Sequence, residues 1–214
     1  MLKKIILMIL FVPFLVGYKV YSNGNTWPII KSDSKIYLKF CQNVTIEEND
    51  VASGDALHGQ TITQALFVDS IVDDFTDIAS SYVSLADAAT DNSFSSTTHA
   101  DRIIEVCNGG VGNMAGFAQQ KTDSEGNVIG CTITLGSLSG KAKELLRVIT
   151  HEVGHCLGLD HPQESKYAVM SYFSSQTDVY RLQNDDKAGL AYLYPNDSGY
   201  SRVNTFGASC AAKN

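Results

Sequence analysis

The chain has 214 residues, 44% of them hydrophobic, which is enough for one domain with a substantial core. It carries 16 basic and 23 acidic residues, a formal net charge of −7 at pH 7. Nucleic acids and anionic membrane surfaces repel such a charge, so we expect neither as a partner.

The N-terminus has the pattern of an export signal. A basic pair precedes an apolar run over residues 5–16, and Val20 and Ser22 suit positions −3 and −1 of a cleavage site. The run is shorter than the ~20 residues that span a membrane. We predict a signal peptide over residues 1–22 and a mature domain over residues 23–214 that is secreted or periplasmic and not inserted in a membrane. An uncleaved anchor is the alternative.

The rest of the sequence predicts strands followed by helices. Segments rich in β-formers predict five strands, at residues 35–40, 81–86, 101–106, 114–119 and 128–135. Residues 41–59 are polar and predict irregular structure. Apolar residues three and four apart predict a long helix over residues 61–78, with four aspartates on its solvent face, Asp69, Asp73, Asp74 and Asp77. A second helix begins at Ser139 or Gly140, and a third runs from Asn184, its N-cap, to about Tyr194. The pattern indicates one α+β domain.

The five cysteines can form disulfides if the chain is exported, and their odd number leaves one over. Cys107 and Cys131 flank two strands expected to be neighbours, so we predict a bridge between them. We pair Cys156 with Cys210. Cys41 then remains as a free buried thiol or, alternatively, as a ligand that blocks a metal.

The segment from His151 to His161 reads His-Glu-Val-Gly-His-Cys-Leu-Gly-Leu-Asp-His. His151 and His155 are four residues apart, so on a helix they lie on one face and can bind Zn²⁺ together. Glu152 beside them is placed to act on a metal-bound water. Gly158 allows the chain to leave the helix with a positive φ, and His161 can return as a third ligand. The segment therefore predicts a zinc site.

This segment resembles the extended zinc motif of the metzincin metallopeptidases. Met170, nine residues after His161, stands where those enzymes have a Met-turn, and residues 184–194 are similar to the closing helix of the matrixin and serralysin branches. The resemblance covers nearly the whole mature chain. It implies a metzincin-like (zincin) fold, with a twisted, mostly parallel five-stranded sheet, a long helix, an active-site helix and a C-terminal helix. Features of both branches occur, so the resemblance leaves the branch open.

The resemblance also assigns roles. It implies that His151, His155 and His161 bind zinc, that Glu152 is the general base, and that Met170 forms a hydrophobic floor beneath the metal. Tyr172 resembles the tyrosine that astacins and serralysins use to ligate the resting zinc and then to stabilise the tetrahedral intermediate; a tyrosine that only packs beside the turn is the alternative. By analogy, an extended substrate pairs with an exposed edge strand over residues 113–119.

We therefore predict a secreted zinc endopeptidase that acts as a monomer on protein or peptide substrates. It would hydrolyse peptide bonds by attack of a zinc-bound water that Glu152 activates. A non-catalytic adhesion or binding module that kept the fold and its zinc is one alternative. A zinc hydrolase that acts on a bond other than a peptide is another.

Overall fold

The structure of the chain is a computed structural model. It describes residues 18–22, 24–28, 34–76, 78, 80–162 and 165–196. Most of the predicted signal peptide, together with Cys210 and its predicted bridge, lies outside the described residues.

A five-stranded sheet forms the base of the domain, in the order β4-β2-β5-β7-β6. Its strands are β2 (Ile36–Phe40), β4 (Leu85–Asp87), β5 (Ile103–Asn108), β6 (Gly116–Thr122) and β7 (Val128–Leu135). Neighbouring strands are parallel except β6, which runs antiparallel to β7. As expected, β6 is an edge strand. The predicted strand at 81–86 begins later than expected, because Ser81 instead makes an isolated bridge to Pro195.

Two short strand pairs were not predicted. β3 (Thr45–Glu48) pairs in parallel with β8 (Ser139–Lys141), and β1 (Lys19–Val20) pairs antiparallel with β9 (Leu159–Asp160). β3 lies within the segment expected to be irregular, and β8 occupies the expected start of the second helix. Strands of two to four residues carry too little hydrophobic alternation to be recognised in sequence.

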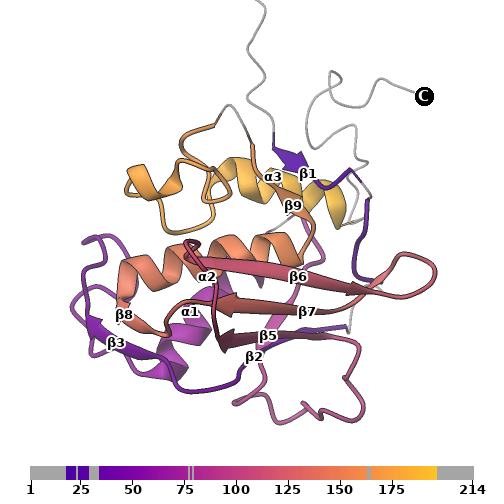
Figure 1. The fold of residues 1–214 in the computed structure, drawn as a ribbon, viewed down its shortest axis with the longest axis horizontal. Coiled ribbons are helices and arrows are strands. Elements are labelled where there is room, and N and C mark those ends of the chain that lie inside the picture. Colours follow the sequence, from indigo (N-terminus) through magenta and orange to yellow (C-terminus); the bar gives the residue numbers. More distant parts are fainter. Residues whose placement is uncertain are drawn as a thin grey trace, which may run out of the picture.

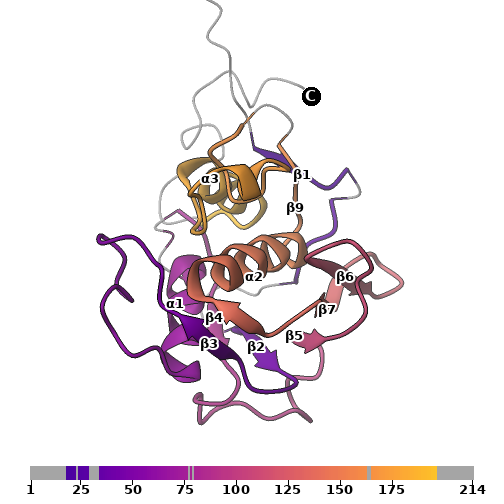
Figure 2. The ribbon, with the colours of Figure 1, turned by 60° about the vertical axis from the view of Figure 1, so that its left-hand side comes forward.

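The described residues also form three α-helices: α1 (Gln64–Thr76), α2 (Ala142–Cys156) and α3 (Asn184–Leu193). α1 and α2 pack against one face of the sheet, and α3 lies with β1 and β9 on the far side of α2 (Figures 1 and 2). The N-cap of α3 is Gln183 rather than Asn184, because Gln183 and Asp186 form a reciprocal capping box. Among the described residues no helix is both long and apolar enough to cross a bilayer.

The core lies between the sheet and the two helices. α2 is buried on almost every side because it lies between the sheet and the segment that carries α3. Each large apolar side chain that is fully buried here contributes about 1.5–3 kcal/mol to folding. Most of them come from α1, the sheet and α2, and they include Phe67, Phe75, Ile104, Ile133, Leu146 and Ile149. This packing makes α2 a rigid support for the residues it carries.

The disulfides differ from the prediction. Cys41 pairs with Cys107, and Cys131 pairs with Cys156. The predicted bridge between Cys107 and Cys131 is wrong because β5 and β7 are parallel, with Ile104 opposite Cys131. Cys107 therefore lies three residues further along, about 10 Å away. The predicted partner of Cys156 is wrong as well, since Cys156 is bonded to β7, and Cys41 is not free.

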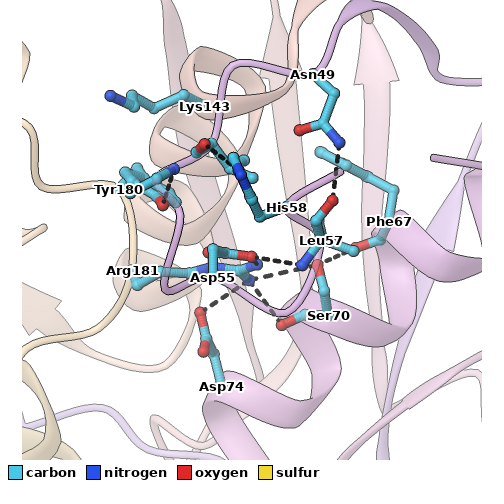
Figure 3. A network of polar contacts seen from close by, with 12 residues as sticks. Asn49, Asp55, Leu57, His58, Phe67, Ser70, Asp74, Lys143, Tyr180 and Arg181 are labelled. Atoms are coloured by element: carbon cyan, nitrogen blue, oxygen red, sulfur yellow. Dashed lines mark hydrogen bonds and ion pairs between the residues drawn. The ribbon is translucent and has the colours of Figure 1, made fainter. Parts of the chain in front are cut away.

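An ion-pair network joins α1 to the segment before α3 (Figure 3). The guanidinium of Arg181 donates to both carboxylate oxygens of Asp55, at 2.9 and 3.0 Å, to the backbone carbonyl of Ser70 at 2.9 Å, and to Asp74 at 3.3 Å. Asp74 was expected on the solvent face of the helix, but it is an ion-pair partner instead. The network fixes the position of the chain that follows the candidate site.

Candidate metal centre and active site

The structure brings three histidines together. His151 and His155 project from α2, and His161 follows β9 after the chain has turned at Gly158, whose φ of +94° suits glycine. The Nε2 atom of His161 lies 3.0 Å from that of His151 and 3.2 Å from that of His155. Among the described residues, these are the one group of three or more possible metal ligands, and their ligand atoms all lie within 4.8 Å of one another.

Hydrogen bonds at Nδ1 fix the orientation of the His151 and His155 rings. Nδ1 of His151 donates to the carbonyl of Val169 at 2.8 Å, and Nδ1 of His155 donates to the carbonyl of Leu159 at 2.8 Å. The proton is therefore on Nδ1, and Nε2 keeps a free lone pair. Burial lowers the pKa of each of the three histidines to about 4. They are neutral at pH 7, which is the state that binds a metal.

Met170 packs against α2 at Gly154, between His151 and His155 in the sequence, and is 2% exposed. Its turn is held by Asp186 of α3, which accepts hydrogen bonds from the backbone N–H groups of Val169 and Met170 at 2.9 and 3.2 Å. The peptide group between these two residues therefore binds Asp186 through its N–H and His151 through its carbonyl. Burial raises the pKa of Asp186 to about 6, while the backbone N–H groups act in the opposite direction. Sequence reasoning missed this anchor.

Gly154 lets α2 approach the turn. A Cβ atom at this position would overlap Sδ of Met170 and would lie 3.1 Å from its Cε. The methionine therefore packs directly against the backbone of the helix that carries two of the histidines. A side chain at Gly154 would have to displace either the helix or the turn.

Glu152 is adjacent to His151 on α2 and is 6% exposed. Its Oε2 atom has no hydrogen-bond partner among the described residues. Burial raises the pKa of this carboxyl to about 7, and a backbone hydrogen bond from Ala118 acts in the opposite direction. A buried carboxylate oxygen without a partner is costly and is typical of a group kept for chemistry.

A cavity of about 490 Å³ lies beside these residues. Its lining comes from the start of β6, from α2 and from the segment after Met170, and includes Gly116, His151, Glu152, His161 and Tyr172. The ring of Tyr172 stacks on His161, with ring centroids 3.8 Å apart, while the side chain remains largely exposed. Four of the five predicted site residues thus line one cavity, and the fifth, His155, contacts His161 behind it.

The donors fit a zinc ion. Three neutral imidazole nitrogens are the ligand set of a catalytic zinc that keeps one position open, and a carboxylate with one unpartnered oxygen lies next to them.

Comparison with known proteins identifies the family. The sequence model of the family described as Matrixin matches residues 67–195, which is more than half of the chain. The chain belongs to the matrixin family. This resolves the choice of branch that the motifs left open. Matrixins are zinc-dependent, and the three clustered histidines of this matrixin are the group that could hold the metal.

Individual relatives match parts of this matrixin. Stromelysin-3 of Rattus norvegicus is 34% identical over 135 residues, which cover 63% of this chain and 26% of the relative. Matrix metalloproteinase-25 of Homo sapiens is 38% identical over 29% of this chain and 12% of the relative. The hatching enzyme of Paracentrotus lividus is 38% identical over 35% of this chain and 12% of the relative. The chain thus spans about a quarter or less of the length of these curated relatives.

A chain of the solved GM1-bound form of the ECX AB5 holotoxin is 16% identical to this matrixin. The match covers 89% of this chain and 92% of that chain, with a TM-score of 0.48. We draw no conclusion from this likeness.

Proposed function

We propose that this matrixin is a zinc-dependent endopeptidase that hydrolyses peptide bonds in proteins. His151, His155 and His161 bind the metal through Nε2. When bound, zinc supplies Lewis acidity, which makes water a stronger acid and polarises a peptide carbonyl. The observation that carries this proposal is the unpartnered, buried oxygen of Glu152 beside the three histidines.

Glu152 is the general base. It takes a proton from the water that attacks the substrate carbonyl and returns that proton to the leaving amine. A carboxyl whose pKa burial raises to about 7 suits both steps, because it can accept and release a proton near neutral pH. A non-catalytic module would gain nothing from such a carboxylate, which argues against that alternative.

The substrate binds in an extended conformation along β6. This strand pairs only with β7 among the described strands, so its other side offers backbone N–H and C=O groups to a peptide. The start of β6 also lines the cavity that holds Glu152. Pairing with the edge would present a peptide bond to Glu152 in the middle of the substrate, which favours endopeptidase action.

Tyr172 assists the reaction. In the structure its ring rests on His161 and its side chain is 62% exposed, so it can move without disturbing the core. We propose that its hydroxyl donates a hydrogen bond to the oxyanion of the tetrahedral intermediate. Tyr172→Phe should then lower kcat and leave KM almost unchanged. An unchanged kcat together with unchanged zinc affinity would remove this role.

The protein acts outside the cytoplasm as a monomer. The two disulfides support an oxidising compartment, and the N-terminal pattern supports export.

The test uses the purified, exported protein with its zinc content measured, and casein or gelatin as substrate. Glu152→Gln should lower the cleavage rate by about 10²–10⁴-fold while zinc remains bound. Glu105→Gln is the matched control, because Glu105 lies on β5 and pairs with Lys39 at the surface. Absence of cleavage by the zinc-loaded protein, or an unchanged rate in Glu152→Gln, would contradict the proposal.

A further inference from the structure

Residues 18–22, which contain β1 and lie within the predicted signal peptide, pack against the candidate zinc site. β1 pairs antiparallel with β9, with Lys19 opposite Asp160 and Val20 opposite Leu159. The backbone N–H of Tyr21 donates to the carbonyl of Gly158 at 3.0 Å. Figures 1 and 2 both show β1 beside β9, with α3 next to the pair. β1 therefore supports the short stretch of chain between the second and third histidines.

Tyr21 contacts one of the proposed ligands directly. Its hydroxyl oxygen lies 3.1 Å from Nδ1 of His155, and the two rings are stacked with centroids 5.8 Å apart. Nδ1 of His155 also donates to the carbonyl of Leu159, so the Tyr21 oxygen is a second acceptor for the same N–H. Two acceptors hold the ring more firmly than one and keep the proton on Nδ1, which leaves Nε2 free for a metal.

The same strand also reaches the third histidine. Nζ of Lys19 lies 2.8 Å from Oδ2 of Asp160, while Oδ1 of Asp160 accepts the backbone N–H of His161 at 2.7 Å. The Lys19 side chain is exposed, so the ion pair contributes little stability by itself. Its effect is to orient the carboxylate that holds the backbone of His161.

α3 provides space for this segment. A Cβ atom on Gly189 would lie 3.3 Å from Cβ and from Cδ2 of Tyr18, which is closer than most such contacts allow. The ring of Tyr18 also lies against that of Tyr192, with centroids 5.5 Å apart. Tyr18 therefore packs closely against α3 at Gly189 and Tyr192.

We propose that residues 18–22 remain in the exported protein as part of the zinc site, and that Tyr21 is a positioning residue for His155. This rests on the proposed zinc binding by the three histidines. It revises the predicted signal peptide, because cleavage after Ser22 would remove both β1 and Tyr21. Cleavage must instead occur before Tyr18, or not at all.

The first test reads the N-terminus of the full chain after export, by intact mass and N-terminal sequencing. The proposal expects a chain that begins at or before Tyr18. A start at Asn23, or at any residue after Tyr18, overturns it. This result does not depend on whether the protein binds zinc or cleaves peptides.

The second test compares Tyr21→Phe with the wild-type protein. The variant keeps the stacked ring and loses the hydroxyl, so strand packing is preserved. Zinc affinity is measured by competition with a chromophoric chelator and should fall about tenfold in the variant. This is the low end of the range for an outer-sphere partner, because the carbonyl of Leu159 still accepts the Nδ1 proton of His155. The Tm of the metal-free protein should stay close to that of wild type, which separates positioning from a general role in stability.

Tyr167→Phe is the matched control, because Tyr167 is 76% exposed, and its zinc affinity should equal that of wild type. A fall of less than about threefold in Tyr21→Phe overturns the positioning role, because outer-sphere partners typically contribute 10–100-fold. If the wild-type protein binds no zinc, the proposed function fails, while the N-terminal reading still decides whether β1 is retained.

Discussion

Replacing Cys131 and Cys156 together with alanine should strongly destabilise the domain. Cys131 lies in β7 and Cys156 is the last residue of α2, so their disulfide ties the end of the proposed zinc-binding helix to an interior strand of the sheet. Both residues are buried. The bridge therefore restrains the part of the chain that supports His155.

The size of the effect follows from the closed loop. The two cysteines are 25 residues apart, and a loop of that length removes about 12 cal/mol/K of entropy from the unfolded chain, or about 3.5 kcal/mol at 25 °C. For a chain of this size, each kcal/mol shifts Tm by about 2–4 °C. We therefore expect Tm to fall by about 7–14 °C.

Guanidinium unfolding of the metal-free protein, followed by tryptophan fluorescence, measures this loss. The chain has one tryptophan, Trp27, whose Nε1 donates to the carbonyl of Cys156 at 2.8 Å, so the signal reports on this region. The control replaces Cys41 and Cys107, which are 66 residues apart, and the same relation gives about 4.3 kcal/mol. A loss below about 1 kcal/mol for the first pair would refute the loop-closure reasoning.

Three further predictions concern residues around the site. Asp186→Asn cannot accept all three backbone N–H groups, so it should cost about 2 kcal/mol of unfolding free energy, measured by denaturation. Arg181→Leu leaves the buried Asp55 without its partner and should cost about 3 kcal/mol, whereas Asp178→Ala, which removes an exposed ion pair, should cost less than about 0.5 kcal/mol. The metal-free protein should lose stability as the pH falls from 6.5 towards 4. The three clustered histidines have a folded pKa of about 4, below their ordinary value of 6.5, so the unfolded chain takes up more protons on them in that range. The raised pKa values of the Glu152 and Asp186 carboxyls act in the opposite direction and offset part of this loss, but three histidines outweigh two carboxyls. Denaturation midpoints measured across this pH range would test it, and a rising midpoint would contradict the sign.

The candidate site was predictable because its information is local. Eleven consecutive residues carry His151, His155 and His161 with Glu152, and helical spacing alone puts the first two on one face. Long elements were also predictable, since α1 and α2 have enough apolar residues for their period to be recognised.

What the sequence did not reveal depends on neighbours in space. Cys41 and Cys107 are bonded because β2 pairs with β5, and no local pattern specifies that pairing. The pairing of β1 with β9 was not predicted either, because the β1 residues have ordinary cleavage-site chemistry and their partner strand lies about 140 residues later in the chain. The anchoring role of Asp186 likewise depends on a turn that another segment supplies.

The close contact between Gly154 and Met170 has a consequence for protein engineering. Because the Met170 side chain packs directly against the backbone at Gly154, a larger residue at position 154 would require a smaller side chain at position 170. A designer who grafts the histidine-bearing helix onto another scaffold must bring the turn with it, in matched volume. The two segments, although sixteen residues apart, form a single transplantable unit.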